Sequence, residues 1–350
     1  MDPIVITGCG WVTPFAAGSI REVLTVAATA APPVDAGYWP VPEELLHGTP
    51  GVTTECRQDA GAHLAAAALE HARRDAGLGS REPGKDDAPT PVPGDRVGMV
   101  LGCALAGQGG MIDFANDVRG QSARFVSPIR FPQTVGNYIA GALARAYDIR
   151  GPNSTLASGI AAGLDAIVEA CAILHSQRAD LVYAGGVERL TPALARGLSE
   201  RGAAGAARAG HCSQSSGTNM VFSDGACWFV LERQADAKRR GATVRAAIES
   251  RPSIREDEAG QICSVAGVSA PGAICIEHWI GRCLGALSAA ALAAGIAAAT
   301  GHTVPTIDQA DPTKIIADRK AGTGQARPVS VAAAGTLDQT KIQLLVEADR

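Results

Sequence analysis

The 350-residue sequence has few aromatic side chains, no apolar run long enough to span a membrane, and no dense cluster of one charge. Aromatic residues make up 4% of the chain and charged residues 19%, against 46% hydrophobic residues. The net charge of −4 arises from 31 basic and 35 acidic side chains, and the densest basic run is only 238–240. This balance gives no reason to expect a nucleic acid or an anionic membrane as a partner. The composition predicts a soluble globular chain with a closely packed interior.

Nine cysteines are present, but no two have the C-x-x-C spacing. Scattered cysteines favour reduced thiols over a disulfide framework or a zinc site. Without that spacing we expect no metal. The Gly-x-Gly at 8–10 lacks the third glycine and the acidic partner of a nucleotide-binding loop, so we also expect no cofactor. The N-terminal residues have neither the charged nor the apolar region of a signal peptide, and the run 285–300 is too short to span a bilayer. We therefore expect a cytoplasmic protein without a membrane partner.

Apolar runs alternate with turn residues along the chain, which indicates an α/β fold. A mostly parallel sheet covered on both faces is expected, with a second half that is an abbreviated copy of the first. The domain boundary is placed between 1–250 and 251–350. In the first half we expect a strand ending in a glycine turn at 8–10, a helix over 59–76 ended by Gly77, strands over 97–101 and 180–186, and a strand pair (219–222 and 226–232) around Asp224. In the second half we expect a loop over 251–272, a helix over 281–299, and a closing strand pair (329–333 and 341–347).

The stretch 151–167 predicts a turn, a short strand, a sharp bend through Ser158 and Gly159, and the start of a helix. This layout places Ile160 at the mouth of a helix N-terminus. The helix macrodipole and the free backbone N–H groups favour a nucleophilic anion at such a position. Isoleucine has no such chemistry, so the backbone pattern and the side chain disagree.

Several short segments, in order along 3–250, carry a resemblance to a known family. They are 5–8 with 12–14, 96–98 with Gly102, 131–132 with Asn137 and 140–141, 151–153, 184–188, 223–226 with 230–232, and 237–242. In their order and spacing the chain resembles the β-ketoacyl-[acyl carrier protein] synthases of the thiolase superfamily. The resemblance implies a layered αβαβα sandwich of two similar halves, here with a truncated second half.

The resemblance also implies a dimer in which the strand near 153–157 pairs across a two-fold axis. The candidate interface residues are Asn153, Ser154, Thr155, Leu156 and Ala157. Members of the family load an acyl chain onto a cysteine at the buried helix N-terminus. Two histidines then assist decarboxylation of malonyl-carrier protein, and a lysine lies nearby.

This sequence departs from the family pattern at each of those positions. The cysteine position is Ile160, the lysine position is Glu277 and the second histidine position is Arg282, while no His-Gly-Thr motif occurs. His302 follows the long helix instead of preceding it, so we interpret it as a turn residue. The resemblance therefore implies a degenerate member with no catalytic residue.

Three hypotheses on function follow. The first is a non-catalytic subunit of the chain-length-factor type in fatty acid, polyketide or aryl-polyene synthesis. It would pair with an active ketosynthase or with itself, and an acyl carrier protein is a further candidate partner. The second is an acyltransferase or thioesterase with a replaced nucleophile. Ser158 and Cys103 are the candidates, although Ser158 lacks a G-x-S-x-G elbow and a lone cysteine is more often a small buried hydrophobe. The third is an acyl-binding scaffold homodimer.

Overall fold

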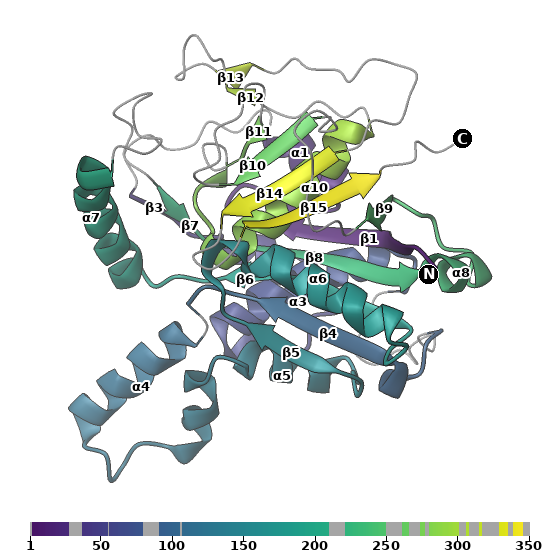
Figure 1. Ribbon diagram of the computed structural model, residues 1–350. Helices are drawn as coiled ribbons and strands as arrows, with labels where there is room; N and C mark the ends of the chain where they lie inside the picture. Colours follow the sequence, from purple (N-terminus) through teal and green to yellow (C-terminus); the bar gives the residue numbers. More distant parts are fainter. Residues whose placement is uncertain are drawn as a thin grey trace.

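The chain forms a large sheet with helices on both faces (Figure 1). The computed structural model describes residues 2–27, 37–54, 56–79, 91–105, 107–209, 221–249, 261–265, 274–276, 280–300, 306–307, 315–316, 329–334 and 339–345. Among the helices in these ranges, none combines the length and the apolar character that a membrane crossing needs.

The sheet consists of two five-strand groups with the same topology. In sheet order the first group is β1 (Ile4–Val12), β8 (Gly225–Arg233), β6 (Leu181–Glu188), β4 (Val97–Gly102) and β5 (Asn153–Leu156), and the second is β9 (Ala246–Glu249), β15 (Gln339–Leu345), β14 (Val329–Ala334), β10 (Gln261–Val265) and β11 (Ile274–Cys275). In each group the first three strands are antiparallel neighbours and the last three are parallel. The groups meet where β1 pairs antiparallel with β9. The second half thus repeats the first in shortened form.

Two expectations about the sheet are wrong. The sheet is mixed and not mostly parallel, because the last long strand of each group returns antiparallel between its neighbours. The range 251–272 is not all loop, since β10 lies within it and pairs with both β14 and β11. Short strands like this one are defined by their backbone partners, which lie far away in the sequence.

The expected glycine turn at 8–10 is also wrong, because β1 runs straight through it to Val12 with one register shift. The glycines serve close packing instead. A Cβ on Gly8 would lie 2.5 Å from the carbonyl oxygen of Ala72, and one on Gly10 would lie 2.0 Å from that of Ala68. Both carbonyls belong to the helix packed on this strand, so glycine lets the helix backbone approach the sheet.

The remaining elements cover the sheet or connect its strands. The helices are α1 (Ile20–Ala27), α2 (Glu43–His47), α3 (Ala60–Asp75), α4 (Gln108–Gln121), α5 (Tyr138–Ala146), α6 (Ala162–His175), α7 (Pro192–Ala209), α8 (Gln234–Arg239) and α10 (Leu287–Ala299). The short strands are β2 (Ala17–Gly18), β3 (Tyr38–Trp39), β7 (Phe222–Ser223), β12 (Thr306–Ile307) and β13 (Ile315–Ile316). The prediction for α3 is confirmed: the Asp59 carboxylate caps it by accepting from the Ala62 N–H at 2.8 Å, and Gly77 follows at φ +69°.

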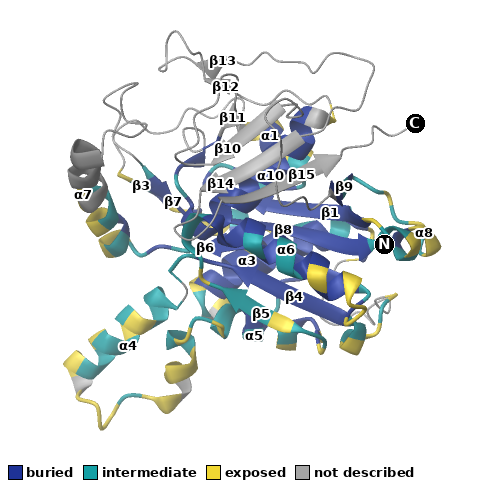
Figure 2. Ribbon diagram, viewed as in Figure 1, coloured by how far each residue is buried: buried dark blue, intermediate teal, exposed yellow. Residues whose placement is uncertain are grey.

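Four strands of the first group, β1, β8, β6 and β4, are buried on both faces, as Figure 2 shows by their dark blue colour, whereas the edge strand β5 is partly exposed. Along β8, Cys227, Phe229 and Leu231 pack with α6 and α10, whereas Trp228 and Val230 pack with α3 and α5. This alternation follows from the two-residue period of a strand. It explains why the strand is apolar throughout instead of alternating with polar residues.

Helices α6 and α10 form the central layer of the molecule. They contact each other; α10 also contacts β6 and β8 of the first group and β10 and β14 of the second, and α6 contacts β4, β6 and β15. Small residues permit this crossing, since a Cβ on Gly163 would lie 2.8 Å from the Ala289 Cβ. The described elements thus form four of the five layers expected of an αβαβα sandwich: α3 with α5, the first strand group, the α6–α10 pair and the second strand group.

Candidate functional site

The stretch 151–167 folds as predicted and ends the first strand group. β5 leads through a bend to a 3-10 turn, Gly159–Ala161, and then directly into α6. Gly159 has φ +72°, a left-handed conformation that favours glycine, and this turns the chain into the helix. The bend thereby sets Ile160 at the helix mouth.

Ile160 is partly buried and joins two apolar clusters. It packs against the main core that contains α6 and α10, and against a smaller cluster formed by Leu190, Ala195, Phe222 and Leu284. An apolar branched side chain between two clusters contributes to their packing at the helix mouth. It offers neither a nucleophile nor a hydrogen bond to a substrate carbonyl.

Ser158 lies at the bend before this turn. Its hydroxyl donates a hydrogen bond to the carboxylate of Asp165, in the first turn of α6. This contact orients the hydroxyl toward an acid and not toward a histidine. A carboxylate is a weaker base toward a serine hydroxyl than a histidine, so the contact is typical of a structural brace at a helix start.

Cys103 follows β4, and its side chain is 1% exposed. Its Sγ lies 3.8 Å from the carbonyl oxygen of Leu156, and the backbone of Gly285 packs on it, because a Cβ there would lie 2.5 Å from the Cys103 Cα. A thiol enclosed in this way has no approach for a substrate, which favours its role as a small core residue.

A buried carboxylate, Glu188, lies at the end of β6 and was not anticipated from the sequence. It accepts backbone N–H groups from Ala104 at 2.7 Å, Leu105 at 3.2 Å and Gly285 at 3.1 Å. Burial raises the pKa of the Glu188 carboxyl to about 7, and the three hydrogen bonds offset that rise only in part. Glu188 thus ties the start of the 3-10 turn Leu284–Ala286, which leads into α10, to the ends of β4 and β6.

Of the two other positions expected from the family pattern, the structure describes only Arg282. Arg282 pairs with β7 through its main chain: its N–H donates to Val221 O at 2.8 Å, and its carbonyl accepts from the Ser223 N–H at 3.2 Å. Glu277 and His302 lie outside the described residues.

Asp224 has a larger role than the turn residue that the sequence suggests, and the expected strand pair around it is wrong. β7 pairs with β3, whereas β8 pairs with β1 and β6. Asp224 lies between β7 and β8, fully buried, and accepts from the Tyr38 hydroxyl at 2.7 Å and from the Val41 and Leu190 N–H groups. Arg189 completes the set with an ion pair at 2.9 Å. These partners fix the segment before α2 to the sheet.

The candidate interface strand lies at one edge of the sheet. β5 pairs with β4 on one side and is the last strand in the order of the described sheet. Asn153 and Ala157 are exposed, and the three residues between them are partly exposed. Unpaired backbone groups at a sheet edge are a template for pairing with another chain.

Comparison with known proteins agrees with this geometry. Residues 44–237, more than half of the chain, match the family model described as beta-ketoacyl synthase, N-terminal domain. The chain belongs to the β-ketoacyl synthase family. It is 26% identical over 263 residues to the 3-oxoacyl-[acyl-carrier-protein] synthase 2 of Coxiella burnetii, covering 70% of this chain and 61% of that protein. It is 30% identical over 161 residues to the corresponding protein of Vibrio cholerae, covering 44% of this chain and 38% of that protein. The chain thus spans less than two thirds of these β-ketoacyl synthases.

Solved structures share the fold at low sequence identity. One is a ketosynthase of a type II polyketide synthase in complex with its acyl-carrier protein, with a TM-score of 0.73 at 17% identity. Another is the ishigamide ketosynthase/chain length factor, with a TM-score of 0.71 at 17% identity. Each covers 99% of this chain and is covered over its full length. The thiolase-like fold expected from the sequence is confirmed.

Proposed function

We propose that this chain is a non-catalytic β-ketoacyl synthase-like subunit that pairs with an active ketosynthase. Its role would be that of a chain-length factor in fatty acid, polyketide or aryl-polyene biosynthesis, with an acyl carrier protein as a further partner of the pair. The observation that carries the proposal is the isoleucine at the mouth of α6. The helix mouth has the backbone of a nucleophile site, and its side chain fills space between two apolar clusters.

Without a thiolate at position 160, no acyl-enzyme can form there, so the condensation that the family performs through this position has no first step. Ile160 also cannot hold a carbonyl by a hydrogen bond, which removes assisted decarboxylation. The proposed contribution of the chain is therefore its surface and its shape, not bond chemistry.

The surface features that support a partner subunit lie next to each other. α4 and the segment after it form an arm that projects from the sheet (Figure 1). This arm exposes large apolar side chains: Met111, Phe125, Phe131 and Val135. Its 3-10 segment, Pro128–Thr134, contacts α5, which contacts the edge strand β5. Exposed apolar groups beside an open sheet edge are typical of a protein–protein interface.

The test is co-expression of the tagged full chain with an intact ketosynthase, followed by size-exclusion chromatography and analysis of the products. We expect a stable complex and an altered product length. Phe125→Asp should weaken the complex because Phe125, 72% exposed, lies on the arm, whereas Val26→Asp, at an exposed site on α1, should leave it intact. A stable monomer that ignores every ketosynthase offered would overturn the proposal.

The alternative of an acyltransferase or thioesterase has less support. Ser158 is engaged by Asp165, and Cys103 is enclosed by Leu156 and Gly285. Incubation with an acyl-carrier protein or acyl-CoA, followed by intact mass analysis, distinguishes the two: a covalent adduct or hydrolysis would favour the enzyme. A symmetric homodimer that changes no ketosynthase product would instead favour the acyl-binding scaffold.

A further inference from the structure

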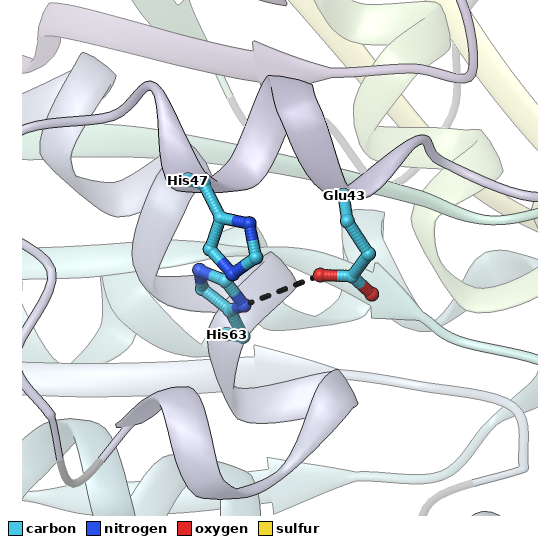
Figure 3. Close-up of side chains that lie close together, drawn as sticks. All are labelled: Glu43, His47 and His63. Atoms are coloured by element: carbon cyan, nitrogen blue, oxygen red, sulfur yellow. Dashed lines mark ion pairs between the residues drawn. The ribbon is translucent and has the colours of Figure 1, made fainter.

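Three side chains with metal-ligating groups meet where α2 lies on α3. Glu43 and His47 are four residues apart on α2, so they lie on the same face, one turn apart. His63 lies in the first turn of α3, directly after the Asp59 cap. Figure 3 shows the Glu43 carboxylate and the His47 ring directed at the His63 ring.

The distances are close to those of a metal site. Each of the three side chains offers one ligand atom, and these atoms all lie within 4.8 Å of one another. His63 Nδ1 lies 3.8 Å from a Glu43 carboxylate oxygen, and the centroids of the two imidazole rings are 5.2 Å apart. Ligand atoms in a tetrahedral zinc site lie about 3.3 Å apart, given metal–ligand bonds of about 2.0–2.1 Å. The exposed Glu43 and His47 side chains can close this difference by small rotations.

His63 supplies a second observation that favours a ligand. Its side chain is nine-tenths buried, and its Nε2 has no hydrogen-bond partner among the described residues. Its Nδ1 is beyond hydrogen-bond length from Glu43. A neutral imidazole nitrogen is a common metal ligand in proteins.

The nearby cation does not oppose a metal ion. The Arg189 guanidinium lies 3.3 Å from the Glu43 carboxylate, but it also pairs with Asp224 at 2.9 Å and donates to Val41 O. Asp224 offsets the charge of Arg189, and Arg189 contacts one carboxylate oxygen of Glu43 while the other oxygen faces His63.

We propose that Glu43, His47 and His63 bind one divalent transition-metal ion of the zinc type, with its remaining coordination position open to solvent. Two imidazoles and one carboxylate are a donor set that suits Zn²⁺ and Co²⁺, whereas Mg²⁺ and Ca²⁺ prefer oxygen donors. The ion would link α2 to α3. α2 is a helix of five residues with no side-chain cap. Such a link would hold α2 on α3, and the contact of Val41 with Asp224 holds the segment before α2.

The experiment uses the full chain, stripped of metal with a chelator and titrated with Zn²⁺ by calorimetry and with Co²⁺ by visible absorption. We expect one ion per chain, a rise in Tm and the intense visible bands of four-coordinate Co²⁺. His47→Ala and Glu43→Gln should each weaken binding by roughly tenfold or more, since even a group that only supports a metal ligand is worth about that much.

The matched control is His175→Ala, at an exposed histidine in the last turn of α6, which should bind as the wild type does. Both test variants alter exposed side chains, so circular dichroism should show them folded. A Co²⁺ spectrum that persists unchanged in His47→Ala would place the ion elsewhere, on thiols for example, and would overturn the proposal. Absence of any binding by the wild-type chain would overturn it too.

Discussion

Two helix mouths occupy equivalent places in the two strand groups, and they are filled in opposite ways. Each of the two helices follows a 3-10 turn, which comes after β5 in the case of α6 and after β11 in the case of α10. The two helices contact each other in the central layer. At the α10 mouth, Leu284, Gly285 and Ala286 are all buried, and the Gly285 N–H donates to the Glu188 carboxylate. At the α6 mouth, Ile160 is partly exposed and no buried carboxylate of that kind accepts from the turn, among the described contacts.

The difference indicates which mouth is available to another molecule. The free N–H groups of a helix N-terminus favour a hydrogen-bond acceptor, and at α10 the protein supplies one itself, the Glu188 carboxyl from a strand in the other half. The α6 mouth remains accessible from outside but holds an apolar side chain. The N-terminus of α10 is thus part of the protein's own packing. The N-terminus of α6 lies nearer the surface and carries no reactive group.

The largest effect is expected from the packing at the α10 mouth. Gly285→Ala would place a Cβ 2.5 Å from the Cys103 Cα, a backbone atom that cannot move aside cheaply. We expect the free energy of unfolding to fall by about 3 kcal/mol or more, at the upper end for overpacked cores. Chemical denaturation measures it. Gly197→Ala, in exposed α7 with no atom within 4 Å of the new Cβ, should instead gain about 0.5–1 kcal/mol. Equal effects would contradict the assigned packing.

Glu188 should make the stability depend on pH. Its pKa is raised by burial from 4.5 to about 7, so the folded state holds the proton more tightly than the unfolded chain does. The resulting contribution to stability is complete below pH 4.5 and is lost as the pH rises through 7, by up to about 3 kcal/mol. In Glu188→Gln this part should vanish. Denaturation of both proteins from pH 4.5 to 8 gives the difference; parallel curves would show that Glu188 titrates normally.

A thiol introduced at the α6 mouth should be accessible without restoring catalysis. Ile160→Cys removes apolar contacts and should cost about 1 kcal/mol, similar to Ile160→Val. Six native cysteines are buried, namely Cys9, Cys56, Cys103, Cys171, Cys227 and Cys283. Brief treatment of the folded variant with iodoacetamide should therefore add one adduct more than in the wild type. Intact mass spectrometry counts the adducts. If no further adduct forms, the α6 mouth is as closed as the α10 mouth, and the comparison fails.

The smallest effect is expected at Ser158. Ser158→Ala removes one partly exposed hydrogen bond to Asp165 and should cost about 1 kcal/mol or less. It should not change how the chain behaves toward acyl-carrier protein or acyl-CoA. Thermal denaturation and a hydrolysis assay measure the two quantities. Loss of a hydrolytic activity in this variant alone would instead identify Ser158 as a nucleophile.

Local signals in the sequence were sufficient for several elements. Asp59 and Gly77 mark both ends of α3, and the bend at Ser158 and Gly159 marks the start of α6, because capping and left-handed glycine are properties of a few neighbouring residues. The resemblance to the β-ketoacyl synthases gave the layered fold. The antiparallel direction of β8 and β15 was missed because it depends on their distant sheet neighbours. The position of β10 was missed because it depends on pairing with β14 and β11, one of them more than sixty residues away.

The candidate sites divide in the same way. The sequence by itself determined that position 160 carries no nucleophile, since this needs only the residue type at a recognisable bend. It also contains the Glu43–His47 spacing, which places both side chains on one helix face. Only the tertiary structure decided that His63 joins them and that Glu188 accepts the Gly285 N–H ninety-seven residues away. The physical reason is that such contacts arise from the packing of separate elements, and no local pattern records which elements will meet.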